Sequence, residues 1–190
     1  KADLHLRVFV PSLMAKNLVL AAVMLLEAGF EAKELSLASA RINLSVPGRL
    51  ELVSEREPHV YVDYAHTPAG VASAVAEIRG RYPTLTVVLG ASGNRDQGKR
   101  EEMGLAGASA DLLIITDQHP RDEDPATIRH ALITAAATNP DAGRILEIPD
   151  PAEAIRTAVL KTSADSAVLW CGPGHLTYRE IRGQKVPFDA

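Results

Sequence analysis

The alternation of short apolar runs with longer amphipathic segments constrains the fold of this chain more than any other feature. Apolar runs such as 85–89 and 112–116 are typical of buried strands. The segments that begin at Pro68, Pro125 and Pro151 are typical of helices, because proline suits the first helical turn. Strands that alternate with helices build βαβ units. The sequence therefore predicts an α/β fold with a mainly parallel sheet flanked by helices.

The N-terminal part of the chain has a different pattern, in which helical signals dominate. A capped helix is expected from Ser12 to a stop at Gly29, and a shorter helix follows it. Pro47 then interrupts the pattern. We therefore expect two parts, a helical part over residues 1–46 and a Rossmann-like domain over residues 47–190.

Composition places the chain among ordinary globular proteins, because hydrophobic residues make up 46% and charged residues 23%. The net charge of -4 and the lack of a basic field argue against nucleic acid or an anionic membrane as partners. The apolar stretch from Leu18 to Leu26 is too short to cross a bilayer. The single cysteine, Cys171, excludes an internal disulfide and a multi-cysteine metal site, and it fits a reducing cytoplasm.

Polar and glycine-rich clusters follow four of the predicted strands. Ligands of open parallel sheets bind beyond the carboxyl ends of the strands. These clusters are therefore the best candidate site in the sequence. They are residues 63–66, 90–96, 117–121 and 172–175.

The second cluster begins a G-N-R-D-Q-G-K stretch over residues 93–99, which fits the G-x-x-x-x-G-K of a phosphate-binding loop. Such a loop needs Ser or Thr after the lysine to ligate Mg²⁺, and this chain has Arg100 there. No stretch of the sequence matches the full pattern with Ser or Thr after the lysine. The residues alone leave two interpretations open, an anion site and a glycine-rich turn. We interpret Lys99 and Arg100 as structural, with their charged heads in solvent.

Four motifs together resemble the C-terminal domain of the Mur ligases, the ATP-dependent amide-forming enzymes of peptidoglycan synthesis. They are VDYAHTP (62–68), GNRDQGKR (93–100), TDQHPRDEDP (116–125) and CGPGHLTYREI (171–181). Their order is that expected of the family member that adds the third amino acid. The resemblance spans nearly the whole chain. It implies that residues 1–46 are the C-terminal remnant of the family's central ATP-binding domain, and that the glycine-rich loop recognises an amino acid.

The resemblance also implies a reaction. ATP phosphorylates the free carboxylate of UDP-N-acetylmuramoyl-L-alanyl-D-glutamate, and the amine of a diamino acid attacks the acyl phosphate. ATP and Mg²⁺ are thus the expected cofactors of the full-length enzyme, a cytoplasmic monomer of cell-wall biogenesis that supports cell shape and division. Its phosphate loop, Mg²⁺ ligands and catalytic residues are expected upstream of Lys1, and the chain also lacks an initiator Met. We therefore expect the chain alone to bind no metal or cofactor and to be inactive.

Three residues resemble the family's nucleotide-facing residues. Arg49 resembles an arginine that reaches ATP when the domains close, and its alternative is a solvated charge. Asp63 and His66 resemble a pair that faces the nucleotide, with the carboxylate placed for the ribose hydroxyls. Their alternative is a role at the start of the helix that Thr67 can cap.

The incoming amino acid is expected to meet a second group of residues. Arg95 resembles the arginine that binds its carboxylate, since a guanidinium can pair with a carboxylate through two bonds. Pairing with Asp96 on the surface is the alternative. A further motif reads Asp-Asn-Pro-Arg in the diaminopimelate-using enzymes, and here it consists of Gln118, His119, Pro120 and Arg121. An exposed loop histidine is the alternative for His119.

Gly172 and Leu176 complete the expected substrate-binding residues. Diaminopimelate-using enzymes carry Glu where this chain has Leu176, and leucine cannot pair with an ammonium group. Arg121 still favours an amino acid with a distal carboxylate, so the identity of the diamino acid stays open. On balance we expect lysine or ornithine, with the distal amine against one of the acids at positions 122–124.

Two alternatives remain from the sequence. One is another ligase of the same superfamily, such as a folylpolyglutamate synthetase or a different Mur ligase. The QHPR stretch (118–121) argues against it, because it lies where the third-amino-acid enzyme has its selectivity motif. The other is a standalone Rossmann-like binding module, which the lack of a complete phosphate loop favours.

Overall fold

The computed structural model describes residue 4, residues 12–41 and residues 46–188. The chain divides into two compact units, residues 1–46 and residues 47–190. Among the described residues, no helix is both long enough and apolar enough to cross a membrane.

The first unit consists of two helices, α1 (Ser12–Glu27) and α2 (Ala32–Ser39). Gly29 follows α1 with a φ of 98°, a left-handed conformation that glycine adopts at low cost, and the helix ends where the sequence predicts. Much of the apolar surface of α1 is exposed in this chain. The exposed side chains are Val19, Leu20, Val23, Met24 and Leu25.

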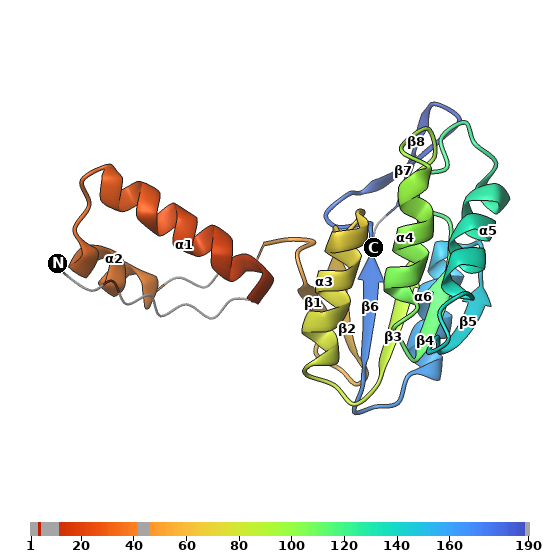
Figure 1. Cartoon of the computed structure of the whole chain (residues 1–190), viewed down its shortest axis with the longest axis horizontal. Coiled ribbons are helices and arrows are strands. Elements are labelled where there is room, and N and C mark those ends of the chain that lie inside the picture. The colour runs from red at the N-terminus through yellow and green to blue at the C-terminus, as the bar shows by residue number, and fades with distance from the viewer. Residues whose placement is uncertain (1–3, 5–11, 42–45, 189–190) are drawn as a thin grey trace. The chain divides into compact units, whose positions relative to one another are not determined.

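The second unit is a six-stranded sheet in the order β1-β2-β6-β3-β4-β5, accompanied by a separate β7–β8 hairpin (Figure 1). Within the sheet β1 runs antiparallel to β2, and the other neighbouring pairs are parallel. The strands are β1 (Glu51–Ser54), β2 (His59–Asp63), β3 (Leu85–Leu89), β4 (Leu112–Ile115), β5 (Arg144–Glu147), β6 (Ala167–Cys171), β7 (Tyr178–Ile181) and β8 (Gln184–Pro187). The predicted α/β fold is therefore confirmed.

Helices cover both faces of the sheet, with α3, α4 and α5 on one face and α6 on the other (Figure 1). The helices are α3 (Pro68–Arg79), α4 (Gly98–Gly107), α5 (Pro125–Ala136) and α6 (Pro151–Lys161). Side chains of β6 alternate between the two layers. Leu169 and Cys171 join the core under α3, α4 and α5, whereas Val168 and Trp170 join the core under α6.

The prolines begin helices as the sequence predicts, and each follows a capping side chain. The Thr67 hydroxyl accepts a hydrogen bond from the backbone of Gly70 in α3. Asp124 and Asp150 cap α5 and α6 in the same way. These caps satisfy backbone donors that the first turn of a helix leaves free.

The strand order brings the polar clusters together. β6 is the last strand of the sheet in sequence, yet it lies between β2 and β3. The loops after β2, β6, β3 and β4 are therefore neighbours at the carboxyl end of the sheet. The β7 strand adds to this end through Ile181, which forms a bridge with Arg121.

Candidate functional site

A cavity of about 380 Å³ opens at the carboxyl end of the sheet. Loops after four parallel strands and residues of the β7 strand form its walls. Its volume falls in the range of small-molecule sites, which is roughly 300–1,000 Å³. The residues that line it are Tyr64, His66, Ser92, Arg95, Lys99, Gln118, His119, Arg121, Gly172, Leu176, Tyr178 and Glu180.

The lining carries an excess of positive charge. Arg95, Lys99 and Arg121 contribute cations, and Glu180 contributes a carboxylate. Arg95 is exposed, and among the described residues it forms no ion pair, so the predicted alternative of pairing with Asp96 is not observed. Its guanidinium is therefore available to an anion.

The loop that carries Arg95 is fastened to the loop after β4. The Gly93 N–H donates to the His119 carbonyl at 2.8 Å, and the Asn94 N–H donates to the Glu123 carboxylate. A Cβ at Gly93 would lie 1.9 Å from the carbonyl oxygen of Pro120, so only glycine fits between the loops. Pro120 is buried at this contact and does not line the cavity.

Arg100 and Lys99 differ from the expectation that their charged heads lie in solvent. Arg100 is 3% exposed, and its guanidinium pairs with the Glu123 carboxylate at 2.9 Å. Lys99 lines the cavity and donates to the His66 carbonyl at 3.1 Å. Burial lowers the pKa of Lys99, although Asp96 acts in the opposite direction. The expectation was wrong for the charged head of Arg100, which is buried, whereas Lys99 is half-buried; both residues lie in the first turn of α4.

Arg121 is held more firmly than Arg95. Its Nε donates to the Glu180 carboxylate at 2.9 Å, and a terminal nitrogen donates to the Gly93 carbonyl at 3.0 Å. Its main chain has a φ of 52°, unusual for a residue other than glycine. The backbone also pairs with β7, since the Arg121 N–H donates to the Glu180 carbonyl at 3.0 Å. Arg121 is thus part of the wall as well as a cation.

His119 is a buried residue of the cavity wall. The backbone N–H of Glu180 donates a hydrogen bond to the His119 Nδ1 at 3.0 Å. Burial lowers the pKa of His119, and the charges of Arg121 and Arg179 act in the same direction. The neutral ring therefore carries its proton on Nε2. The alternative of an exposed loop histidine is not observed, since the residue is 7% exposed.

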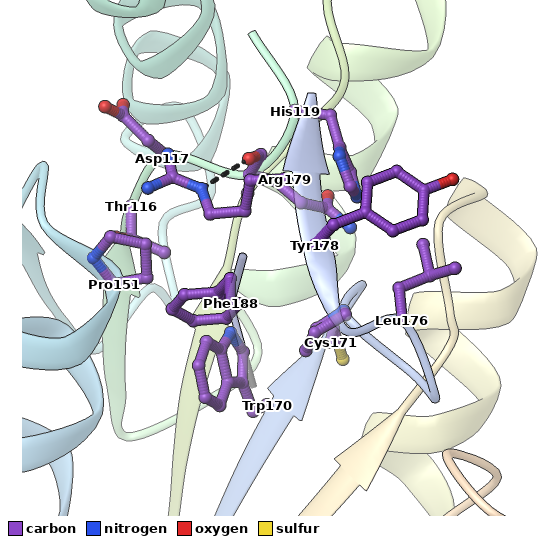
Figure 2. Close-up of a pocket in the computed structure, with 13 residues that line it drawn as sticks. Thr116, Asp117, His119, Pro151, Trp170, Cys171, Leu176, Tyr178, Arg179 and Phe188 are labelled. Carbon is purple, nitrogen blue, oxygen red and sulfur yellow. Dashed lines mark hydrogen bonds between the residues drawn. The ribbon is translucent and has the colours of Figure 1, made fainter. Parts of the chain in front are cut away.

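A second, much smaller cavity of about 10 Å³ is drawn in Figure 2. It shares Gln118, His119, Leu176 and Tyr178 with the first. Such a volume holds at most about one water molecule. Arg179 spans this region, and its Nε donates to the Gln118 carbonyl at 2.8 Å. The smaller cavity is therefore a packing space beside the site.

Gln118 and Gly172 meet at the boundary of the two cavities. Gly172 has a φ of 116°, and a Cβ there would lie 2.4 Å from the Gln118 amide nitrogen. The Gln118 side-chain oxygen is buried, and no hydrogen-bond donor reaches it within the described chain. Such an oxygen favours a ligand that brings an N–H or O–H donor.

The three acids after Arg121 are occupied elsewhere, contrary to the expectation that one of them faces a distal amine. Asp122 accepts a hydrogen bond from the Asn94 side chain at 2.8 Å. Glu123 pairs with Arg100, and Asp124 caps α5. None of the three lines the cavity. The sequence could not reveal this, because their partners come from the preceding loop and from the helix start.

The residues expected at the nucleotide lie around Tyr64. The Arg49 guanidinium is exposed and stacks 5.0 Å from the centroid of the Tyr64 ring. His66 is exposed, lines the cavity, and its ring lies 4.7 Å from that of Tyr64. Both side chains are exposed, and the His66 Nδ1 lies 2.9 Å from the Tyr64 carbonyl oxygen.

Asp63 has a different setting. Its two carboxylate oxygens accept hydrogen bonds of 2.7 Å from the backbone of Leu50 and of Ala65, and the residue is 2% exposed. Burial raises the pKa of this carboxyl, although the two donors and Arg49 oppose the shift. The geometry therefore favours a positioning role for Asp63, which holds the segment that carries Arg49.

Several lining residues escaped sequence reasoning. They are Tyr64, Ser92, Lys99, Tyr178 and Glu180. Each lies within or beside a quoted motif, but only the fold shows which side chains turn inward. Among the described residues, no cluster of three or more His, Cys, Asp or Glu side chains is arranged to hold a metal ion.

Comparisons with known proteins agree with this geometry. The profile of the family described as "Mur ligase, glutamate ligase domain" matches residues 48–174. A UDP-N-acetylmuramyl-tripeptide synthetase of Leifsonia xyli subsp. xyli is 43% identical over 93% of this chain and 35% of that protein. A UDP-N-acetylmuramoyl-L-alanyl-D-glutamate--2,6-diaminopimelate ligase of Rickettsia prowazekii is 36% identical over 98% of this chain and 38% of that protein.

Solved structures point the same way. A UDP-N-acetylmuramoyl-L-alanyl-D-glutamate--2,6-diaminopimelate ligase matches with a TM-score of 0.67 and 30% identity, over 97% of this chain and 38% of that one. A folylpolyglutamate synthase of Mycobacterium tuberculosis gives a TM-score of 0.63 at 23% identity, which shows the fold alone. The chain spans little more than a third of the length of these relatives. The family profile covers most of the second unit, and the chain belongs to the Mur ligase family as its C-terminal domain.

Proposed function

We propose that this chain is the amino-acid-binding part of an ATP-dependent ligase that adds a diamino acid to UDP-N-acetylmuramoyl-L-alanyl-D-glutamate. The observation that carries the proposal is the cavity on which three cations converge, Arg95 from the loop after β3, Lys99 from the first turn of α4 and Arg121 from the loop after β4. An exposed, unpaired Arg95 suits the α-carboxylate of the incoming amino acid, because a guanidinium binds carboxylates through two parallel bonds. The amine of that amino acid then attacks an acyl phosphate, and positioning supplies much of the rate.

ATP is proposed to bind beside the same cavity, where His66 is part of the lining and Arg49 lies against the neighbouring Tyr64 ring. The Arg49 and His66 side chains are exposed beside Tyr64 and can meet phosphate or base, His66 through Nε2, since its Nδ1 lies 2.9 Å from the Tyr64 carbonyl oxygen. Asp63 fits the ribose less well, because its oxygens already accept backbone hydrogen bonds. When bound, ATP supplies the phosphoryl group that activates the acceptor carboxylate. We assign Mg²⁺ to the part of the ligase outside this chain, together with the catalytic residues.

The larger protein is proposed to be a cytoplasmic monomer. Residues 1–46 are proposed to be the end of its central ATP-binding domain. The exposed apolar side chains of α1 support this assignment, because surfaces of that kind usually pack against further structure.

The substrate is proposed to be lysine or ornithine. Leu176 lines the cavity where diaminopimelate-using enzymes are expected to carry Glu, so a contact expected for diaminopimelate is missing from this lining. The Arg121 charge is already balanced by Glu180, so it does not require a distal carboxylate. The names of the Rickettsia relatives favour diaminopimelate as the competing candidate.

Amide formation by the full-length ligase tests the proposal. With ATP, Mg²⁺ and the UDP-linked dipeptide, kcat/KM is measured for lysine, ornithine and diaminopimelate. We expect product with at least one of them and higher values for lysine or ornithine. A clear preference for diaminopimelate would overturn the substrate choice, and no product with any diamino acid would overturn the function.

The 190-residue chain alone provides a second measurement. We expect it to stay at background in the same assay, because its sequence contains no complete phosphate-binding loop. The full-length ligase, assayed in parallel, is the positive control. Turnover by the isolated chain would contradict the assignment of the phosphate loop to another domain.

A further inference from the structure

Glu180 is a cavity residue to which the recognised motifs give no role. It lies in β7, beyond residue 174, where the match to the family profile ends. Among the described residues that line the cavity it is the single carboxylate, and it shares the space with Arg95, Lys99 and Arg121. A carboxylate in a cationic cavity repels anionic ligands. Its presence there therefore suggests that it binds a positively charged group of the ligand.

The position of Glu180 is fixed from two sides. Its carboxylate accepts a hydrogen bond from Arg121 Nε at 2.9 Å through Oε2. Its backbone N–H and carbonyl are bound to His119 and to the Arg121 N–H. The hydrogen bond from Arg121 lowers the pKa of Glu180, so the side chain is ionised near neutral pH.

Glu180 retains capacity for a ligand. Its second oxygen, Oε1, has no hydrogen bond within the described chain, and the side chain is 37% exposed. An ionised carboxylate offers about four acceptor sites, and Arg121 occupies one of them. The remaining sites suit a compact donor such as an ammonium group.

The surroundings match the shape of a diamino acid. Leu176 and Tyr178 line the cavity together with Glu180, and they provide apolar contacts for a methylene chain. Arg95 offers a cation for the α-carboxylate, while Asp122, Glu123 and Asp124 are engaged outside the cavity. The described lining thus offers a distal ammonium a single carboxylate.

We propose that Glu180 determines specificity for the incoming amino acid, with its carboxylate binding the distal ammonium group and Arg121 holding that carboxylate in place. The inference rests on the proposed function, since it names a residue that selects the substrate of the same site. Glu180, in β7, thus supplies the carboxylate that Leu176, in the loop before β7, cannot supply.

A thermodynamic cycle that combines one change in the protein with one change in the substrate tests this in the full-length ligase. Wild type and Glu180→Gln are each assayed with the best diamino acid and with its analogue that lacks the distal amine. The pairs are lysine with norleucine, ornithine with norvaline, and diaminopimelate with 2-aminopimelate. In the wild type we expect kcat/KM to fall about 10- to 100-fold when the amine is removed, the scale of a hydrogen bond to a charged group. In Glu180→Gln the two values should lie within about 3-fold of each other.

Two further variants separate direct binding from an effect through Arg121. Arg121→Gln removes the group that holds the carboxylate but keeps the carboxylate itself, so the preference for the amine should fall by less than in Glu180→Gln. Glu153→Gln removes a carboxylate from an exposed pair with Arg156 on α6 and should keep wild-type kinetics.

Each result decides the matter. An unchanged preference for the amine in Glu180→Gln overturns the inference while leaving the proposed function intact. Loss of the preference in Arg121→Gln to the same extent as in Glu180→Gln assigns selectivity to Arg121 instead. Failure of the wild type to use any diamino acid overturns the proposed function itself.

Discussion

Two arginines of the same cavity, Arg95 and Arg121, are held in opposite ways. Arg95 lies on a glycine-rich loop, is exposed and forms no ion pair within the described chain. Arg121 binds the Glu180 carboxylate and the Gly93 carbonyl, and its backbone is paired with β7. Its side chain is 17% exposed. The difference shows that Arg95 is available to a ligand. Arg121 instead forms part of the cavity wall and positions the Glu180 carboxylate.

The loops that carry Arg95 and Arg121 are nevertheless connected by one residue, Glu123, whose contacts we call the joint. Glu123, in the loop that follows Arg121, pairs with Arg100 and accepts the Asn94 N–H from the Arg95 loop. The hydrogen bonds from Arg100 and Asn94 lower the pKa of Glu123, so the carboxylate stays charged. The Arg95 side chain is therefore unpaired, whereas the backbone beside it is held in place by hydrogen bonds.

The largest effect is expected when this joint is broken. Glu123→Ala leaves the buried Arg100 guanidinium without its carboxylate. Removing one partner of a buried pair costs about 3–5 kcal/mol, so we expect the free energy of unfolding in urea to fall by at least about 3 kcal/mol. The matched change Glu153→Ala breaks an exposed pair and should cost less than about 1 kcal/mol. Equal losses in the two variants would show that the joint contributes no more than a surface pair.

A smaller effect is expected when the arginines are exchanged for lysine. Arg95→Lys in the full-length ligase should lower kcat/KM for the amino acid. The expected loss of transition-state stabilisation is about 1.5–3 kcal/mol, because lysine cannot form two parallel hydrogen bonds to a carboxylate. Its stability should stay at the wild-type value, since the exposed side chain has no ion pair to lose. A defect in ATP use with normal use of the amino acid would place this loop at the nucleotide.

Arg121→Lys sharpens the contrast. Lysine can keep one bond to Glu180 or to Gly93 but cannot reproduce both, because its ammonium is a single point on a flexible stem. We expect lower stability together with weaker use of the amino acid, whereas Arg95→Lys should change only the second. If both variants changed only the kinetics, the two arginines would not differ as their contacts indicate.

The same contrast shows how far the sequence could predict the molecule. Proline-led helices, apolar strands and the meeting of four loops at one end all follow from local patterns, and they were predicted correctly. The inward turn of Arg100 and Lys99 was not predicted, since it depends on contacts to Glu123 and His66 across the fold. Glu180 was missed for the same reason, because β7 pairs with the loop of Arg121 over a separation of 59 residues.

The smallest effect concerns His119, beside Arg121 in the cavity wall, and the pH dependence of the free energy of unfolding. Burial lowers the pKa of His119 in the folded chain below its ordinary value near 6.5. As the pH falls below about 6.5, the unfolded chain takes up a proton at this position before the folded chain does, so the free energy of unfolding decreases. His119→Asn keeps an acceptor for the Glu180 N–H but cannot be protonated, and it should reduce this decrease.

Urea unfolding at several pH values between 7.5 and 5 measures that slope for wild type and His119→Asn. His130→Asn is the matched control, because His130 is exposed on α5 and its replacement should leave the slope unchanged. A smaller slope in His119→Asn alone would show that the wall is built around a neutral imidazole, whose Nε2 proton is then available to the ligand. Identical slopes in all three proteins would mean that position 119 titrates alike in the folded and unfolded chains. In that case the ring would be charged below pH 6.5 and would add to the cations of Arg95 and Arg121.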